Sequence, residues 1–296
     1  MAEPMTERLH DLAPGLDSLP PDAIAGHLLA AQAQALAAIS TATPDIARGG
    51  RIMADTLCAG GRLIYAAAGS SGLMAMADAC ELAGTYGVDP ACISILMAGG
   101  LPRDATMPGG TEDDRAEAAT AARIITEKDA VILLSASGTT PYALEIARIA
   151  QARGAASIAI ANNADAPLFD GATLAICLPT PPELIAGSTR MGAGTAQKVA
   201  LNMMSTIMGV ALGHIHDGMM VNLRADNAKL AARAATMIAR ITGSNDATTH
   251  LATTGGAVKP AILLAAGARD LDQAEALLAA SGGHIRAALA ALKTRA

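Results

Sequence analysis

Two short segments rich in small hydroxyl residues each follow an apolar run of strand length and precede a helical pattern. They are Gly69-Ser70-Ser71-Gly72, named here the Ser/Gly turn, and Ser135-Ala136-Ser137-Gly138-Thr139-Thr140, named the Ser/Thr turn. The free N–H groups and the positive dipole end of a first helical turn attract phosphate. Either segment alone could be only a helix cap, but two in neighbouring units favour a phosphate site. Because neither GxGxxG nor GxxxxGKS/T is present, we expect a sugar phosphate and not a nucleotide.

A carboxylate lies at the far end of the helix that follows the Ser/Gly turn. Glu81 is surrounded in sequence by Ala, Leu, Cys and Gly, so we expect it to be partly desolvated and suited to a general base. On a straight helix, the residues from Ser71 to Glu81 span roughly 15 Å, more than the distance from a sugar's 6-phosphate to its C2. Either the helix breaks early, or the carboxylate serves a pocket that another subunit completes. We therefore expect a homodimer with shared active sites.

The elements that must position these residues alternate between strands and helices. This alternation predicts an α/β fold with a doubly wound parallel sheet, in which ligands bind beyond the carboxyl ends of the strands. An arm with two amphipathic helices parted by Thr43-Pro44 is expected over 1–57, the sheet domain over 58–225, and a small module of four or five short helices over 226–296. The expected strands are 62–67, 92–97, 130–135, 156–161 and 173–178, and the expected helices between them are 72–83, 112–126 and 141–153.

Composition excludes several classes of protein. The chain has 296 residues, a net charge of -6, one Phe and no Trp, which argues against a nucleic-acid partner. Its four cysteines form no CxxC pair, so we expect a reducing, cytoplasmic location. The N-terminus lacks the pattern of a signal peptide, and no run of about 18 apolar residues predicts a membrane span. No cluster of His, Cys and carboxylate residues indicates a metal, and we expect no cofactor.

Both turns resemble the phosphate-binding turns of SIS (sugar isomerase) domains. The residues that match the phosphate-holding hydroxyls of that family are Ser71, Ser135, Ser137 and Thr140, and Ser70 and Gly138 lie beside them. More narrowly, the chain resembles the N-acetylmuramic acid 6-phosphate etherases and the related glucokinase regulatory proteins, almost from Thr6-Glu7 to its C-terminus. The most specific match is the run GSTRMGAGTAQK at 187–198. It adds Ser188, Arg190 and Lys198 as anion contacts, and the segments 78–87, 221–230 and 282–286 also correspond.

The resemblance implies a lyase that cleaves the lactyl ether of N-acetylmuramic acid 6-phosphate. The products are N-acetylglucosamine 6-phosphate and D-lactate, and the resemblance places the reaction in peptidoglycan recycling. It also implies Glu81 as the base and Glu112 as the acid. The base removes the C2 proton, which the C1 aldehyde makes acidic, while the acid protonates the departing lactate oxygen. Water then adds at C3, the two groups exchange roles, and no metal or redox cofactor is required.

Several features leave alternatives open. Glu112 follows Thr111 at an expected helix start, where it could be only a helix-start acid together with Asp113 and Asp114. Positions where the etherases usually carry Arg or Lys are occupied by Leu73, Thr139 and Gly192, which leaves the exact substrate open. An aldose–ketose isomerase would use a base at C2 without an acid at C3. A catalytically silent sugar-phosphate sensor would bind a protein partner.

Overall fold

A computed structural model describes residues 4–225 and 227–294 of the protein. Contacts divide the chain into two compact units. The first comprises the residues up to Cys80 and Ala91–Thr206, and the second comprises Glu81–Pro90 and the residues from Ile207 onward. The expected division into 1–57, 58–225 and 226–296 stays a prediction. Its second boundary falls on Asp226, which lies outside the described residues, as do residues 1–3 and 295–296.

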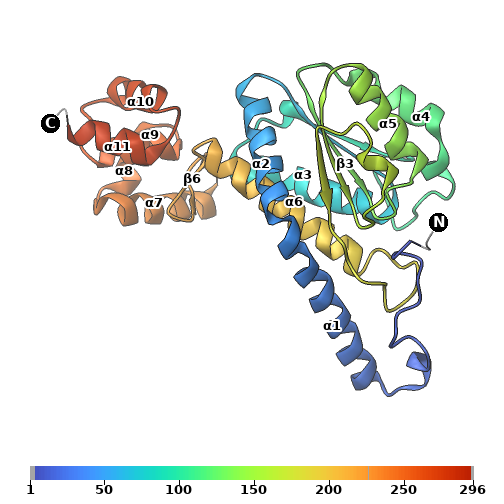
Figure 1. Ribbon diagram of the computed structural model, residues 1–296. Coiled ribbons are helices and arrows are strands. Elements are labelled where there is room, and N and C mark those ends of the chain that lie inside the picture. Colours follow the sequence, from blue (N-terminus) through green and yellow to red (C-terminus); the bar gives the residue numbers. More distant parts are fainter. Residues whose placement is uncertain (1–3, 226, 295–296) are drawn as a thin grey trace. The chain divides into compact units, whose positions relative to one another are not determined.

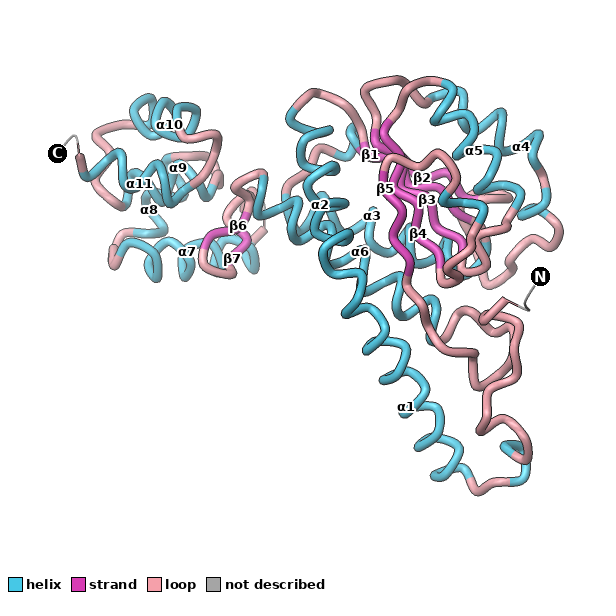
Figure 2. Tube along the Cα trace, in the orientation of Figure 1, coloured by secondary structure: helices cyan, strands magenta, loops and turns pink. Residues whose placement is uncertain are grey.

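The first unit is built around a five-stranded parallel sheet (Figure 1, Figure 2). The strands are β1 (Leu63–Ala67), β2 (Ile93–Met97), β3 (Ala130–Ser135), β4 (Ala156–Ala161) and β5 (Leu174–Cys177). Their order across the sheet is β2-β1-β3-β4-β5. β1 and β3 are buried along their whole length, which explains why they are continuous apolar runs without alternation. The expected doubly wound α/β sheet is confirmed.

Helices cover both faces of this sheet (Figure 1). On one face lie α4 (Arg115–Ala121) and α5 (Pro141–Ala152), and on the other lie α2 (Thr43–Cys58) and the first parts of α3 (Gly69–Tyr86) and α6 (Gly192–Ala211). Successive side chains of a strand point to opposite faces. Accordingly, Ile64 belongs to the core cluster with Tyr142 and Ile146 of α5, while Tyr65 meets Asp78 of α3.

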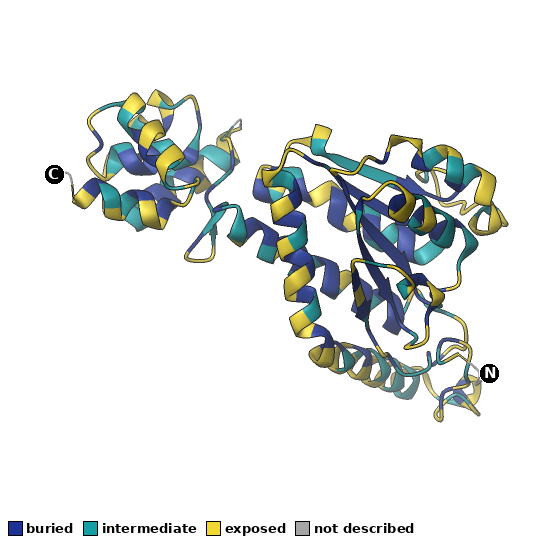
Figure 3. Ribbon diagram, turned by 45° about the horizontal axis from the view of Figure 1, so that its top comes forward, coloured by how far each residue is buried: buried dark blue, intermediate teal, exposed yellow. Residues whose placement is uncertain are grey.

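The N-terminal residues form an irregular arm and a largely unpacked helix. α1 (Pro21–Ala38) is followed by a 3-10 turn at Ile39–Ala42, so the expected break lies just before Thr43-Pro44. α1 carries no Lys or Arg, and Ala35 is its one buried residue. Figure 3 shows this helix mostly in the colours of exposed and intermediate residues. By length and hydropathy, the helical stretch Pro21–Cys58 could cross a membrane, with a mean hydropathy of 1.3. Helices of soluble proteins pass the same test, so this finding alone assigns no membrane contact.

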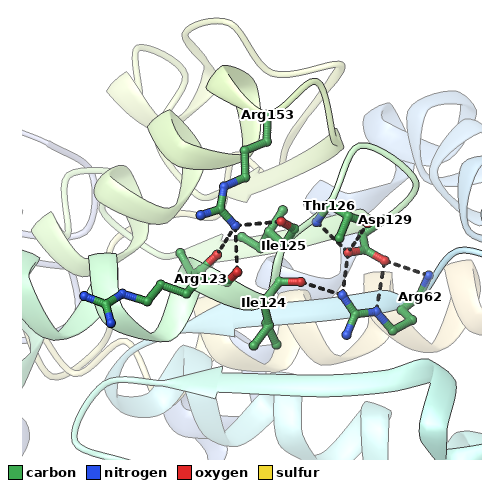
Figure 4. Close-up of polar contacts among 8 residues, drawn as sticks. Arg62, Arg123, Ile124, Ile125, Thr126, Asp129 and Arg153 are labelled. Carbon is green, nitrogen blue, oxygen red and sulfur yellow. Dashed lines mark hydrogen bonds and ion pairs between the residues drawn. The ribbon is translucent and has the colours of Figure 1, made fainter.

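The edge of the sheet opposite the two turns is closed by polar contacts (Figure 4). Asp129, which directly precedes β3, is buried and accepts hydrogen bonds from the backbone and guanidinium of Arg62 and from Thr126. Nearby, the guanidinium of Arg153 donates to the carbonyl groups of residues 122, 123 and 125. These bonds join the starts of β1 and β3 and therefore fix the register of the two strands that carry the turns.

Within its described residues, the second unit is helical apart from one short hairpin and an isolated β-bridge between Arg224 and Ala257. The hairpin joins β6 (Ile215–His216) to β7 (Met219–Met220), and the helices are α7 (Ala228–Thr242), α8 (Ala247–Thr253), α9 (Val258–Ala265), α10 (Leu271–Ala280) and α11 (Ile285–Lys293). A shared core that includes Val221, Ile238 and Ile262 holds them together. Short 3-10 helices elsewhere in the chain are Leu16–Ser18, Pro90–Cys92, Thr111–Asp113, Ala122–Ile124 and Pro167–Phe169.

Candidate active site

The two turns leave neighbouring strands at the same edge of the sheet. β1 and β3 are parallel partners, with Ala67 opposite Leu134 at their carboxyl ends. β2 lies on the far side of β1, so the chain order reverses between β1 and β3. Such a switch point opens a crevice for ligands, because the helices that follow the two strands lie on opposite faces. The structure thus places the Ser/Gly turn and the Ser/Thr turn at the carboxyl ends of neighbouring strands, where this rule predicts a ligand site.

The hydroxyl groups of the Ser/Thr turn form one hydrogen-bonded cluster. Oγ of Ser135 lies 2.8 Å from Oγ1 of Thr140 and 3.4 Å from Oγ of Ser137. It also accepts a hydrogen bond of 3.0 Å from the N–H of Gly138. Three hydroxyls and a backbone amide therefore converge within one turn, at a helix start where phosphate is favoured.

Gly138 is required by the shape of this turn. Its φ of +74° lies in the left-handed region, and a Cβ atom placed there would lie 2.2 Å from the Cβ of Ala166. Asn163 supports the turn from outside, because its Nδ2 donates to the carbonyl of Ser137 at 3.2 Å. The same Nδ2 donates to Oγ1 of Thr6 in the N-terminal arm at 3.2 Å.

The Ser/Gly turn is part of α3 itself. The helix begins at Gly69, three residues before the expected start at Gly72, so Ser70 and Ser71 stand in its first turn. Ser71 is buried and Ser70 is half-buried. First-turn residues carry N–H groups that have no partner within the helix, which makes this position suitable for an anion.

Glu112 lies beside the Ser/Gly turn. A Cβ atom placed on Gly69 would be 4.0 Å from Oε2 of Glu112. The continuous helix expected over 112–126 is wrong, because Asp114 is extended and begins α4 by accepting hydrogen bonds from the N–H groups of residues 116 and 117. Glu112 therefore stands in a separate 3-10 turn, is exposed, and makes no hydrogen bond or ion pair with the described residues. The capping role considered for it belongs to Asp114.

Glu81 lies on the same helix as the Ser/Gly turn. α3 runs without interruption from Gly69 to Tyr86, so the early helix break considered from the sequence is wrong. In the single chain Glu81 is exposed and not partly desolvated as expected, because it faces away from the apolar side of the helix. Glu81 belongs to the second unit and Glu112 to the first, and their pairing in one site remains a prediction.

Asp78 anchors α3 one turn before Glu81, and its role was missed from the sequence. This buried carboxylate accepts hydrogen bonds from the hydroxyl of Tyr65 at 2.9 Å, from Nδ2 of Asn202 at 2.8 Å and from the hydroxyl of Ser205 at 3.0 Å. Burial, together with the charge of Asp78, raises the pKa of Tyr65 well above its usual value, so the phenol remains a donor. β1, α3 and α6 are joined at this one residue.

A second missed residue, Glu183, caps α6. Its buried carboxylate accepts hydrogen bonds of 2.8 Å from the N–H groups of Gly192 and Ala193. The cap comes from nine residues upstream, beyond the reach of local capping patterns. A Cβ atom on Gly192 would lie 3.0 Å from Ala35 and 3.1 Å from Oε2 of Glu183, which gives a structural reason for the small residue at this position.

The remaining expected contacts lie in and after the loop that precedes α6. Ser188 is half-buried in the loop before α6, while Arg190 and Lys198 are exposed. The loop after β2 carries a further exposed cation. Arg103 lines a hollow of about 380 Å³ together with Leu101, Pro102, Asp104, Thr106 and neighbouring residues. Among the described residues, no group of three or more His, Cys, Asp or Glu side chains is placed to hold a metal ion.

The chain is similar to a domain family, to curated relatives and to solved structures. A family model described as the SIS domain matches residues 113–207. A Streptomyces avermitilis protein named N-acetylmuramic acid 6-phosphate etherase is 42% identical over 280 residues, which cover 93% of this chain and 90% of the relative. A Deinococcus radiodurans protein of the same name is 39% identical over 288 residues, covering 96% and 94%. Among solved structures, a phosphoheptose isomerase from Neisseria gonorrhoeae has a TM-score of 0.48 and 15% identity, covering 63% of this chain and 97% of that one.

Proposed function

The chain belongs to the N-acetylmuramic acid 6-phosphate etherases, and from this premise we propose how its residues carry out the reaction. It is a carbon–oxygen lyase that cleaves the lactyl ether of N-acetylmuramic acid 6-phosphate, giving N-acetylglucosamine 6-phosphate and D-lactate. The aldose–ketose isomerase considered from the sequence has less support, because these relatives share the etherase name. The single observation that carries this conclusion is the sequence identity of these relatives to this chain, which extends over almost its whole length.

The 6-phosphate binds between the two turns. Ser135, Ser137 and Thr140 donate their hydroxyl protons to its oxygens, and the hydroxyls of Ser70 and Ser71 complete the contacts. The N–H of Gly138, which donates to Oγ of Ser135, orients that hydroxyl toward the phosphate. The hydrogen-bonded cluster at Ser135 supports this assignment, because the hydroxyls already converge and lose little freedom on binding. Ser188, Arg190 and Lys198 meet the rest of the anionic ligand.

Glu81 and Glu112 divide the acid–base work. Glu81 removes the C2 proton, and Glu112 protonates the lactate oxygen as the C3–O bond breaks; a water then adds at C3 while the roles reverse. Support for Glu112 comes from its place beside Gly69 and from the absence of any bond to the described residues that would hold its carboxylate elsewhere. Support for Glu81 comes from the family resemblance of segment 78–87.

Active sites are shared between two copies of the chain. Along the unbroken α3, Glu81 lies roughly 15 Å beyond Ser71, too far to serve C2 of a sugar whose phosphate sits at the same helix start. α1 supplies an apolar surface for a second copy, since Leu29 is 73% exposed and Leu36 is 41% exposed on a helix without Lys or Arg. Exposed apolar surface of this kind marks an association site.

The dimer is tested by Leu29→Asp combined with Leu36→Asp, which places charge on that surface. We expect a shift from dimer to monomer in sedimentation velocity and loss of lactate release. Leu12→Asp, at an exposed position outside α1, is the matched control and should remain dimeric and active. A fully active monomer would rule out shared sites.

We also infer a cytoplasmic location, supported by a phosphorylated substrate and by four cysteines without disulfide bonds in the described residues. The expected absence of nucleic-acid, membrane and cofactor partners stays a prediction. A fluorescent fusion or cell fractionation would test the location, and recovery of the enzyme with the membrane fraction would contradict it.

The direct test of function is incubation with N-acetylmuramic acid 6-phosphate and a coupled assay for D-lactate, beside a panel of other hexose 6-phosphates. Glu81→Gln and Glu112→Gln should each abolish lactate release while leaving ligand binding in place. Glu127→Gln, at an exposed position on the opposite edge of the sheet, should keep full activity. Turnover of another hexose 6-phosphate without lactate release would assign the chain to a different reaction, and no turnover of any would favour a sensor.

A further inference from the structure

The helix that carries Glu81 ends at a residue held by other parts of the second unit. This residue is Tyr86, the last residue of α3, and it is buried. Its carbonyl accepts a hydrogen bond of 3.0 Å from Nδ2 of Asn222, which follows the β6–β7 hairpin. The last carbonyl groups of a helix have no partner within the helix. Asn222 therefore satisfies one of them from a position 136 residues away.

Gly87 lets the chain leave α3 directly against Asn222. Its φ of +64° is the left-handed conformation typical of a helix end, and its N–H donates to the carbonyl of Ala83 at 3.0 Å. A Cβ atom at this position would lie 2.2 Å from the carbonyl oxygen of Asn222 and 2.8 Å from its Nδ2. Glycine is therefore needed for both the turn and the close approach.

Gly209 of α6 provides the seat for the Tyr86 ring. A Cβ atom on Gly209 would lie 2.7 Å from Cδ1 and 2.9 Å from Cε1 of that ring, so the ring rests on bare backbone. Tyr86 is thus fixed on its ring by α6 and on its carbonyl by Asn222, which leaves α3 little freedom to slide or rotate.

Fixing Tyr86 also fixes the direction of Glu81. Tyr86 lies five positions after Glu81, which corresponds to about 7.5 Å along the helix and about 140° around it. With the Tyr86 side of the helix buried, the Glu81 side faces outward and is exposed. A rotation of the helix at Tyr86 would therefore move the Glu81 carboxylate by the same angle.

On the basis of the base role proposed above for Glu81, we propose that Asn222 is a positioning residue for catalysis. With Gly87 and Gly209, it holds the end of α3 so that the Glu81 carboxylate keeps the orientation needed to take the C2 proton. Asn222 touches neither substrate nor the reacting atoms. This proposal gives a role to the segments 85–87 and 221–223, which resemble the etherases: they hold the end of α3.

The test is a double-mutant cycle between Asn222→Ala and Glu81→Asp, measured by lactate release. A displacement of about 1 Å at a catalytic group costs up to about 100-fold in rate. We expect Asn222→Ala to lower kcat about tenfold or more with KM within about twofold. In the Glu81→Asp background, where the carboxylate is already misplaced, the same substitution should lower kcat less than about threefold. Gly209→Ala, which displaces the Tyr86 ring, should reproduce the kcat loss if Asn222→Ala does not fold.

Asp270→Ala is the matched control, because it removes the side-chain cap of α10 in the same unit without touching α3. Its midpoint of thermal unfolding should fall while kcat stays unchanged. An unchanged kcat in Asn222→Ala, an equal loss in both backgrounds, or an equal loss in Asp270→Ala would overturn the positioning role. Glu81→Gln distinguishes failure of the base role from failure of the positioning role. If Glu81→Gln keeps its activity, the base role of Glu81 is refuted. If Glu81→Gln is inactive while Asn222→Ala is fully active, only the positioning role of Asn222 is refuted.

Discussion

Thr140 offers the most conservative test of the phosphate contacts. Its hydroxyl lies 2.8 Å from that of Ser135, and Thr140→Val keeps the shape of the side chain while removing this donor. A hydrogen bond to a charged group contributes about 1.5–3 kcal/mol, so we expect KM for N-acetylmuramic acid 6-phosphate to rise roughly 10- to 100-fold. Thr120→Val, at an exposed position of α4, is the control. A KM within about twofold of the original would remove Thr140 from the site.

At the same scale, three single residues bear on the charge of the candidate site. Leu73, Thr139 and Gly192 stand at positions where the family resemblance predicts basic residues, and Gly192 is packed against Ala35 and Glu183. A side chain there would press on the carboxylate that caps α6. Arg190 and Lys198 are exposed cations in the segment that resembles the etherases, and the exposed Arg103 lines the hollow in the loop after β2.

At the scale of elements, the N-terminal arm is tied to the Ser/Thr turn through Asn163. This residue accepts a hydrogen bond from Met5 N–H at 2.9 Å and donates to Thr6 and to the carbonyl of Ser137. Asn163→Ala should loosen both the N-terminal arm and the Ser/Thr turn. Because each hydrogen bond contributes about 1 kcal/mol, we expect KM to rise about threefold to tenfold. The arm should also become exposed to limited proteolysis. Ser18→Ala, which removes a bond within the arm, should change neither. An unchanged KM and cleavage pattern would contradict the coupling.

The opposite edge of the sheet is tested through Asp129. Although burial alone would raise the pKa of this carboxyl, hydrogen bonds from Arg62 and Thr126 hold it below its usual value. Asp129→Asn leaves the Arg62 charge without its partner, so we expect the free energy of unfolding at pH 7 to fall by about 3 kcal/mol.

The stabilisation by Asp129 depends on pH with a defined sign. A carboxyl with a lowered folded pKa contributes fully above its unfolded pKa of about 3.9, and the contribution is lost as the pH falls through the folded pKa. The difference in unfolding free energy between the original protein and Asp129→Asn should therefore be constant from pH 7 to about 5 and shrink below about 4. Urea unfolding at several pH values measures it, and a difference that grows toward low pH would contradict the ion pair.

Elements defined by local patterns could be predicted, and elements defined by distant contacts could not. β1, β3 and their turns follow from buried apolar runs next to Ser, Thr and Gly. The break at Asp114 was missed because an acid-rich segment resembles a helix start, and only its hydrogen bonds distinguish the capping residue from Glu112. The roles of Asp78 and Glu183 depend on partners many residues away, which no local pattern reveals.

For the whole molecule, shared sites make a quantitative prediction. Dimers of Glu81→Gln and dimers of Glu112→Gln should both be inactive. If each site takes Glu81 from one chain and Glu112 from the other, subunit exchange creates mixed dimers in which one of two sites is intact. With equal amounts and free exchange, half of the dimers are mixed, so about a quarter of the original activity should return. No recovery despite exchange shown by mass spectrometry would place both glutamates in one chain.

The most direct test of the central claim is the reaction of N-acetylmuramic acid 6-phosphate in deuterium oxide, with the products followed by NMR and mass spectrometry. Removal of the C2 proton followed by addition of water should give D-lactate together with N-acetylglucosamine 6-phosphate that carries deuterium at C2. Glu81→Gln should give neither product. Release of lactate with the original hydrogen retained at C2, or no release of lactate by the unaltered protein, would contradict the account.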